Sequence, residues 1–363
     1  MTMRFTHQTL GQRVLFGAGN TVSDLVAESE RISAGDGAAS RIMLIVSDSV
    51  STIADAIEDK LPVAHRHRGA RRHVPVEDAH TARHEAEQAD IDLILCLGGG
   101  SAVGLAKAVA LTAHLPIIAV PTTYAGSEAT NVWGMTENGR KTTGVDDAVL
   151  PASVIYDADL VRDLPAELTV ASGINALAHS IDSMWAPRAN PINQAWATEA
   201  MRALAEGLPQ VAHHPAESRE GRQQMQYGAY LSAVAFASAG SALHHKICHV
   251  LGGAFDLPHA QTHSVVLPYV LAFNAPATPE AAVRIAAALG AEHPVEGLQT
   301  LRQRIDAPQA LRDHGLKEEH LEEAAQLVLG ATPETNPRHV TSRDAERLVY
   351  AMWAGEDPGQ LTR

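Results

Sequence analysis

The sequence predicts an α/β domain with a parallel sheet over residues 1–160 and an all-helical domain over residues 161–363. A chain of 363 residues is long for one hydrophobic core, so two domains are the first expectation. Short apolar runs alternate with helical patterns as far as residue 157, which is typical of a parallel sheet covered by helices. Only helical periodicity follows Pro165, so we expect no sheet in the second half.

The strands of the first domain are expected where short apolar runs end in polar or glycine residues. Arg41–Val50 is the most continuous run, and such a strand is buried on both faces of a parallel sheet. The basic segment His65–Pro75 indicates either a contact to an extra phosphate or a solvated edge. Strands are predicted within Arg13–Gly19, Arg41–Val50, Ile91–Ser101, the start of Leu115–Thr130 and Val154–Asp157, and helices over 22–32, 53–61 and 79–89.

The second domain is predicted to be a set of helices. In His244–Pro268, Gly252-Gly253 and Pro258 interrupt the helical period, so we expect a helix, a turn and a second helix that begins near Pro258. Further helices are predicted over residues 171–184, 195–208, 222–238, 280–289, 318–329 and 342–354.

Composition and charge exclude several classes of function. A formal charge of −14 argues against nucleic acid and anionic membranes as partners. No apolar run reaches the roughly eighteen residues of a membrane span, and the polar residues 1–15 do not resemble a signal peptide. Cys96 and Cys248 lack the spacing of a disulfide framework, so we expect buried thiols in a cytoplasmic protein.

A glycine turn in the first domain has the properties of a phosphate cradle. The apolar run from Ile91 ends in three consecutive glycines and a serine, and a helical pattern begins at once. Glycines allow a ligand to approach the backbone, and a helix N-terminus offers free N–H groups. Ligands of open parallel sheets bind at the carboxyl ends of the strands, so we expect a Rossmann-like dinucleotide site. Its candidate residues are Asp48, Gly98, Gly99, Gly100, Ser101, Thr122, Thr123 and Ser127.

The histidine-rich segment His244–Pro268 is the strongest chemical signal in the second domain. His245 and His249 are four residues apart, as are His259 and His263, so each pair lies on one face of a helix. Two such pairs that meet across a turn can line a polar pocket that polarises an oxygen atom or holds a metal. The alternative is two solvated histidine faces.

Several motifs occur in the order found in the iron-dependent alcohol dehydrogenase superfamily. They are GGGSAVGLAKA, PTTYAGSEAT, SGINALAHSIDS and HHKICHVLGGAFDLPHAQTHSVVLP. The last string, together with GARRHVP, KTTGVDDAVLPASVIYD and NPRHVT, most resembles the maleylacetate reductases. The resemblance extends nearly from end to end and implies the dehydroquinate synthase-like fold of that superfamily. It also implies a homodimer and a cleft between the two domains.

The resemblance assigns roles to the candidate cofactor residues. Gly98, Gly99, Gly100 and Ser101 would bind the pyrophosphate, and the hydroxyls of Thr122, Thr123 and Ser127 would lie along the cofactor. Asp48 would contact the adenosine ribose, where a carboxylate favours NADH over NADPH because it repels a 2′-phosphate. Lys141 corresponds to a lysine near the nicotinamide.

The metal ligands of the superfamily are only partly present. Metal-dependent members use one aspartate and three histidines, and their aspartate opens a D-x-x-x-H motif. Here the motif reads N-A-L-A-H, so Asn175 replaces the aspartate and His179 is retained. The other ligand positions fall on His245 and His259, and His249 matches a pocket histidine that is not a ligand. Loss of the anionic ligand weakens a site for Fe²⁺, although three imidazoles still suit Zn²⁺. The expectation is no bound metal, with His179, His245 and His259 as the ligands if one binds.

The activity implied is the NAD(P)H-dependent reduction of the conjugated C=C bond of 2-maleylacetate to 3-oxoadipate, in the degradation of aromatic compounds. Hydrogen-bond donors from imidazolium and lysine would stabilise the enolate formed by hydride transfer. The candidate catalytic residues are His245, His249, His259, His179 and Lys246. Contacts to the dicarboxylate substrate are expected from His244, Asn175, Lys141 and His263.

Three other functions remain open at this point. The first is a metal-dependent alcohol or lactaldehyde-type dehydrogenase of the same superfamily. The second is a lyase of the dehydroquinate synthase type, which would need a phosphate pocket richer in lysine and arginine. The third is a non-catalytic NAD-binding protein, which the density of ionisable groups in the second half disfavours.

Overall fold

The computed structural model describes residues 4–33, 40–47, 50–71, 74–137 and 140–362. The chain forms two compact units, one of Thr9–Leu164 and one of Pro165–Arg363 together with Met1–Gln8. The division falls four residues after the predicted boundary at 160/161, because the turn that follows the last strand remains with the sheet.

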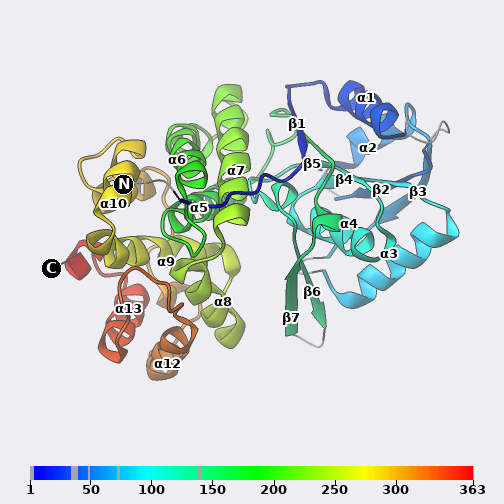
Figure 1. The fold of residues 1–363 in the computed structure, drawn as a ribbon. Coiled ribbons are helices and arrows are strands. Elements are labelled where there is room, and N and C mark those ends of the chain that lie inside the picture. Colours follow the sequence, from blue (N-terminus) through cyan, green and yellow to red (C-terminus); the bar gives the residue numbers. More distant parts are fainter. Residues whose placement is uncertain (1–3, 34–39, 48–49, 72–73, 138–139, 363) are drawn as a thin grey trace. The chain divides into compact units, whose positions relative to one another are not determined.

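The α/β unit is built on a six-stranded parallel sheet, in which β3 and β1 are the edge strands. Every residue of β2, β4 and β5 is buried, as expected for strands covered by helices on both faces. The predicted parallel sheet is therefore confirmed. The strand order is β1 (Arg13–Phe16), β8 (Ser153–Tyr156), β5 (Ile117–Pro121), β4 (Leu93–Gly98), β2 (Ile42–Val46) and β3 (Val63–Arg68) (Figure 1).

Four helices connect these strands. Leu25 of α1 and Ile57 of α2 pack with the apolar residues of β2 and β4 in one core. Arg83 of α3 donates hydrogen bonds of 2.9 and 2.7 Å to the carbonyl oxygen of Ala108 of α4, so α3 and α4 lie side by side. The helices are α1 (Thr21–Ser33), α2 (Ser51–Glu58), α3 (Val76–Gln88) and α4 (Gly100–Ala113).

Two features of this unit differ from the sequence analysis. The predicted basic segment His65–Pro75 is partly a strand, because His65 to Arg68 belong to the edge strand β3. We call residues 122–131, between β5 and β6, the hydroxyl-rich loop. It is followed by an antiparallel hairpin of β6 (Val132–Glu137) and β7 (Arg140–Val145), which was not predicted (Figure 1). Its strands mix apolar residues with glycine, threonine and charged residues, so the hairpin lacks the continuous apolar run of a core strand.

The second unit is helical, as predicted, and its described residues contain no strand. Glycines allow the first three helices to pack closely: a Cβ atom at Gly173 would lie 2.7 Å from Met225 Cε, and one at Gly228 would lie 2.7 Å from Leu204 Cγ. The helices are α5 (Ala166–Ser183), α6 (Pro191–Val211), α7 (Arg219–Ala239), α8 (Leu243–Phe255), α9 (His259–Asn274), α10 (Pro279–Ala288), α11 (Pro294–Arg304), α12 (Leu321–Ala331) and α13 (Ser342–Ala354). None of the helices described here is long and apolar enough to span a membrane.

The turn in the histidine-rich segment is placed differently from the prediction. Helix α8 continues through Gly252 and Gly253, and the chain leaves the helix at Asp256, where φ is 50°. Pro258 then precedes the first residue of α9, as expected. The glycines do not break the helix, because the tertiary packing of α8 outweighs their low helix propensity.

Candidate functional site

The three glycines at the end of β4 have different surroundings: Gly98 and Gly99 face close neighbours, and Gly100 is exposed. A Cβ atom at Gly98 would lie 2.1 Å from Ser47 Oγ, and one at Gly99 would lie 2.8 Å from Thr123 Cγ2. Among the described residues, no heavy atom would lie within 4 Å of a Cβ atom at Gly100. Gly98 and Gly99 thus permit close packing of the strand ends. Gly100 is the first residue of α4, and no side chain of the described residues caps the N-terminus of this helix.

The hydroxyl-rich loop between β5 and β6 is held by a buried lysine that the sequence analysis did not single out. Lys107 of α4 is 1% exposed, and its Nζ donates hydrogen bonds of 2.7 Å to the carbonyl oxygens of Ser127 and Thr130 and one of 2.8 Å to that of Val132. Burial lowers the pKa of Lys107 to about 7. A lysine within the apolar pattern of residues 102–113 was the signal available in the sequence.

The predicted cofactor residues that the structure describes lie at this edge of the sheet. The amide nitrogen of Thr122 donates a 3.0 Å hydrogen bond to the carbonyl oxygen of Gly98, so the hydroxyl loop and the glycine turn are adjacent. Ser101 lies in the first turn of α4, and Ser127 begins a short 3-10 helix. Asp48 falls outside the described residues, and only the backbone of Lys141 is described, in β7.

The predicted histidines gather within the helical unit. His179 of α5 stacks on His245 of α8, with ring centroids 5.0 Å apart and ring planes at 15°. His263 of α9 approaches His245 with ring centroids 5.1 Å apart. His244 Nε2 and His263 Nδ1 are 3.0 Å apart and share a hydrogen bond. His259 joins the set through His263, at a centroid distance of 4.3 Å. We call His179, His244, His245, His259 and His263 the imidazole cluster.

The cluster has a buried interior and an exposed edge. His244, His245 and His263 are 0%, 3% and 1% exposed, whereas His259 is exposed. His249, whose ring centroid lies 6.4 Å from that of His245, is also exposed. His244 and His263, which were predicted to contact the substrate, are as deeply buried as His245 and share a hydrogen bond.

The other predicted residues lie around the cluster. Lys246 is exposed on α8, while its neighbour His245 is buried, as expected for residues about 100° apart on a helix. Asn175 is half-buried one turn before His179 on α5. Cys248 is buried, and burial raises the pKa of its thiol well above the ordinary value, so it is an inert thiol as predicted.

A buried carboxylate that the sequence analysis missed orients His245. Asp182 is 0% exposed, and its Oδ2 lies 2.7 Å from His245 Nδ1. The same oxygen accepts hydrogen bonds from the backbone nitrogens of Ala242 at 3.1 Å and His245 at 3.3 Å. Asp182 follows His179 by three residues on α5, a spacing that places both on one face and was visible in the sequence.

The hydrogen bond to Asp182 fixes the protonation of His245. Burial raises the pKa of Asp182, but two backbone N–H groups donate to the same carboxylate oxygen, which identifies it as an acceptor. We therefore assign the proton of this contact to His245 Nδ1, and a neutral ring then has a bare lone pair on Nε2. Burial, followed by the nearby His249 and His259, lowers the pKa of His245 well below the ordinary value, so the ring is neutral. Nε2 is buried and has no hydrogen-bond partner among the described residues. In this resting form His245 can accept a proton at Nε2 but cannot donate one there.

The residues do not fit the metal site that the resemblance describes. In the described part of the chain, two sets of three groups bring one ligand atom each within 4.8 Å of one another: His244 with His245 and His263, and His65 with His67 and Glu85. The trio of His179, His245 and His259 is not among these sets, and Asn175 supplies no negative charge. In the buried set, the bond between His244 and His263 and the contact with Asp182 occupy one nitrogen of each ring, and the other nitrogen of each ring has no hydrogen-bond partner among the described residues.

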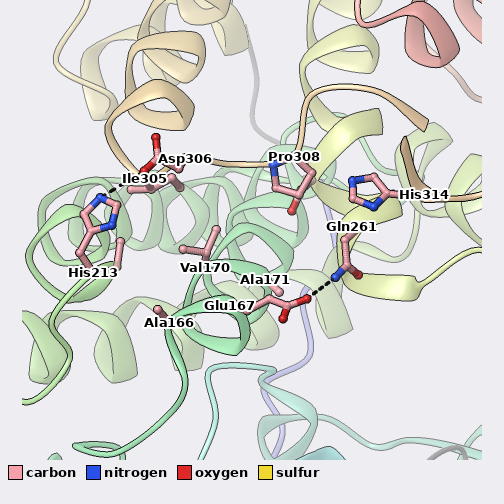
Figure 2. Close-up of a pocket in the computed structure, with 12 residues that line it drawn as sticks. Ala166, Glu167, Val170, Ala171, His213, Gln261, Ile305, Asp306, Pro308 and His314 are labelled. Atoms are coloured by element: carbon pink, nitrogen blue, oxygen red, sulfur yellow. Dashed lines mark hydrogen bonds and ion pairs between the residues drawn. The ribbon is translucent and has the colours of Figure 1, made fainter. Parts of the chain in front are cut away.

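A cavity of about 290 Å³ in the helical unit lies apart from these residues (Figure 2). Val170, Gln261 and Asp306 are among its lining residues, and Gln261 Nε2 donates a 2.7 Å hydrogen bond to Glu167 Oε1. None of the predicted catalytic or cofactor residues lines it. His213, which also lines the cavity, is exposed.

Comparisons with known proteins agree along the whole chain. Residues 12–158 match the family described as iron-containing alcohol dehydrogenase, and residues 169–353 match its C-terminal part. A maleylacetate reductase from Sphingobium indicum is 41% identical over 360 residues, which are 98% of this chain and 99% of that protein.

Two solved structures illustrate the similarity of the fold. An iron-containing alcohol dehydrogenase from Corynebacterium glutamicum superposes with a TM-score of 0.95 at 52% identity, over 99% of this chain and 100% of that one. A maleylacetate reductase from Rhizobium sp. strain MTP-10005 superposes with a TM-score of 0.92 at 37% identity, over 98% of this chain and 100% of that one.

The buried imidazoles predict that acid destabilises the helical unit. Burial is the largest cause that lowers the pKa values of His244, His245 and His263 well below the ordinary value of 6.5. Below about pH 6.5 the unfolded chain therefore binds more protons than the folded chain, and stability falls as the pH falls. Each imidazole that stays neutral contributes up to about 1.4 kcal/mol per pH unit to this slope.

Urea unfolding between pH 7.5 and 5, followed for the wild type and His263→Asn, checks this expectation. The free energy of unfolding of His263→Asn should depend less steeply on pH than that of the wild type. His293→Asn, a change at an exposed histidine that precedes α11, should retain all of it. Equal slopes for His263→Asn and the wild type would contradict the assignment of a neutral buried imidazole.

Proposed function

The chain belongs to the iron-containing alcohol dehydrogenase family, and from that premise we propose that it is a maleylacetate reductase. It reduces the conjugated C=C bond of 2-maleylacetate with NAD(P)H and releases 3-oxoadipate. Similarity to maleylacetate reductases over nearly the full length supports this choice within the family. The structural observation that carries it is the imidazole cluster, in which Asp182 holds His245 with an unprotonated Nε2.

The cofactor is assigned to the carboxyl edge of the sheet. We place the pyrophosphate at Gly100, where a side-chain atom would meet open space and the uncapped start of α4 offers N–H donors. The hydroxyls of Thr122, Thr123 and Ser127 belong to the adjacent loop and would contact the rest of the dinucleotide. Asp48 would favour NADH over NADPH, and Lys141 would lie toward the nicotinamide.

The reaction adds a hydride and a proton across the substrate's double bond. A bound nicotinamide cofactor would supply the hydride for the alkene carbon β to the ketone, and the electron pair of the C=C bond would move toward the ketone oxygen to give an enolate of the substrate. A proton then adds to the carbon next to the ketone. Because the enolate spreads its charge over carbon and oxygen, hydrogen-bond donors can stabilise it without the full charge of an alkoxide.

The geometry assigns a proton path to the cluster. His249 and His259 lie at its exposed edge, where they can exchange protons with water. We propose that His245 takes a proton at Nε2 and passes it to the substrate, while Asp182 stabilises the imidazolium that forms for that moment. In this proposal His245 becomes the imidazolium donor that the sequence analysis expected only when it takes up the proton. Lys246, exposed on the same helix, is the candidate to bind a substrate carboxylate.

We propose that this path operates without a bound metal. Asn175 in place of the family's aspartate and the spacing of His179, His245 and His259 support this reading. A single observation favours the metal-dependent alcohol dehydrogenase instead: a carboxylate that bonds Nδ1 of a histidine with a bare Nε2 is also the usual support of a metal ligand. The two readings differ in what a chelator does to activity.

An assay with chelator-treated protein tests the proposed function. The loss of NADH absorbance on addition of maleylacetate should proceed at an unchanged rate in the chelator, with one equivalent of 3-oxoadipate formed per NADH. Simple alcohols with NAD⁺ should give no comparable rate. Inactivity toward maleylacetate, together with alcohol oxidation that the chelator abolishes, would establish the alternative.

A substitution at Asp182 tests its role as a positioning residue. Asp182→Asn keeps the side-chain volume but removes the charge that stabilises the protonated ring, so kcat should fall by about 10²- to 10⁴-fold. NADH binding, measured by fluorescence, should not change, and the pH profile of kcat should shift. Asp313→Asn, at a side chain that is 64% exposed, is the matched control. Unchanged kcat in Asp182→Asn would remove the residue from the mechanism.

A further inference from the structure

A second group of histidines, in the α/β unit, has no part in the proposed function. His65 and His67 are two residues apart on the edge strand β3, so their side chains point to the same face. Arg66 between them points to the other face, where its Nη1 donates a 2.6 Å hydrogen bond to Asp55 Oδ1 of α2. The arginine charge is thereby directed away from the two imidazoles.

Helix α3 places a carboxylate against this pair. Glu85 Oε2 lies 2.6 Å from His67 Nδ1 and 3.1 Å from His65 Nε2. One ligand atom from each of the three residues lies within 4.8 Å of the others. The His67 side chain is 8% exposed, whereas those of His65 and Glu85 are 32% and 29% exposed. The group therefore has a closed inner side and an open outer side that faces solvent.

We propose that His65, His67 and Glu85 form a binding site for a divalent transition-metal ion of the Zn²⁺ class. Two imidazole nitrogens and one carboxylate oxygen are donors that Zn²⁺ prefers, and Mg²⁺ and Ca²⁺ favour oxygen alone. Ligand atoms of tetrahedral Zn²⁺ lie about 3.3 Å apart, so the distances of 2.6 and 3.1 Å need only small rotations. For binding, each ring presents a lone pair at the nitrogen that now faces Glu85, so the proton there moves to the other ring nitrogen or, from an imidazolium, is released to water. Water completes the coordination.

The consequence of binding is a link between β3 and α3. An edge strand is otherwise held on one side only, so a metal ion that joins it to a helix stabilises this part of the sheet. The site lies in a different unit from the imidazole cluster. Zinc found in the purified protein would then belong to the sheet edge and carry no information about catalysis.

Zinc titration of chelator-treated full-length protein tests the site. The wild type should bind one equivalent of Zn²⁺ that is lost in His67→Ala. In Glu85→Gln, which keeps the side-chain shape, affinity should fall by at least about tenfold, the lower bound for changes that only support a ligand. His80→Ala, at an exposed histidine of the same helix, and His245→Ala, in the other unit, should retain the equivalent.

A second readout separates binding from loss of the fold. Zn²⁺ should raise the unfolding temperature of the wild type and His80→Ala but not that of Glu85→Gln, because an ion that binds only the folded state stabilises it. Maleylacetate reduction should be the same in all α3 and β3 variants. Equal zinc stoichiometry in the wild type and Glu85→Gln, or loss of the equivalent in His245→Ala, would overturn the proposal.

Discussion

The hydrogen bond between Asp182 and His245 is the constraint on which the chemistry of the helical unit depends. A neutral imidazole has two tautomers, and only the partner at Nδ1 decides which nitrogen carries the proton. Here a carboxylate that is 0% exposed makes that choice and leaves a lone pair at Nε2. Burial lowers the pKa of His245 and keeps the ring neutral. In the proposed mechanism, the same carboxylate stabilises the positive charge when the ring takes up a proton.

The remaining histidines make this arrangement rigid. His244 and His263 bond to each other, and His179 stacks on His245 from α5. Such a cluster costs stability, because each imidazole gives up its hydration and its proton in the folded state. The α/β unit contains a comparable arrangement, because the buried Lys107 donates hydrogen bonds to carbonyl oxygens of the hydroxyl-rich loop and of the first residue of β6. In both units a buried polar group fixes the position of residues assigned to ligand contact.

The sequence predicted those parts of the structure that follow from local pattern. The buried strand Ile42–Val46 and the helix that begins at Gly100 could be predicted because apolar runs and glycine turns act within a few residues. The spacing of four placed His245 near His249 and His259 near His263. His179 and His244 join the cluster through contacts between helices, which no spacing reveals. The β6–β7 hairpin was missed because its strands mix apolar and polar residues without a continuous apolar run, although the pair Asn138-Gly139 is a hairpin signal in the sequence. The continuation of α8 through two glycines could not be predicted, because tertiary packing decides it. The sequence analysis missed Asp182 and Lys107 for a related reason. Each contacts a segment that is distant in sequence, and a single charged residue in an apolar helix does not identify its partner.

The tautomer of His245 is the most direct test of this account. Long-range ¹H–¹⁵N NMR spectra of the protein with ¹⁵N-labelled histidine, assigned with His245→Ala, report the protonation of each ring nitrogen. At pH 7 the account predicts a neutral ring with Nδ1 protonated and Nε2 bare, and a change of tautomer or charge in Asp182→Asn. A resting ring protonated at both nitrogens, or at Nε2 alone, would contradict the account.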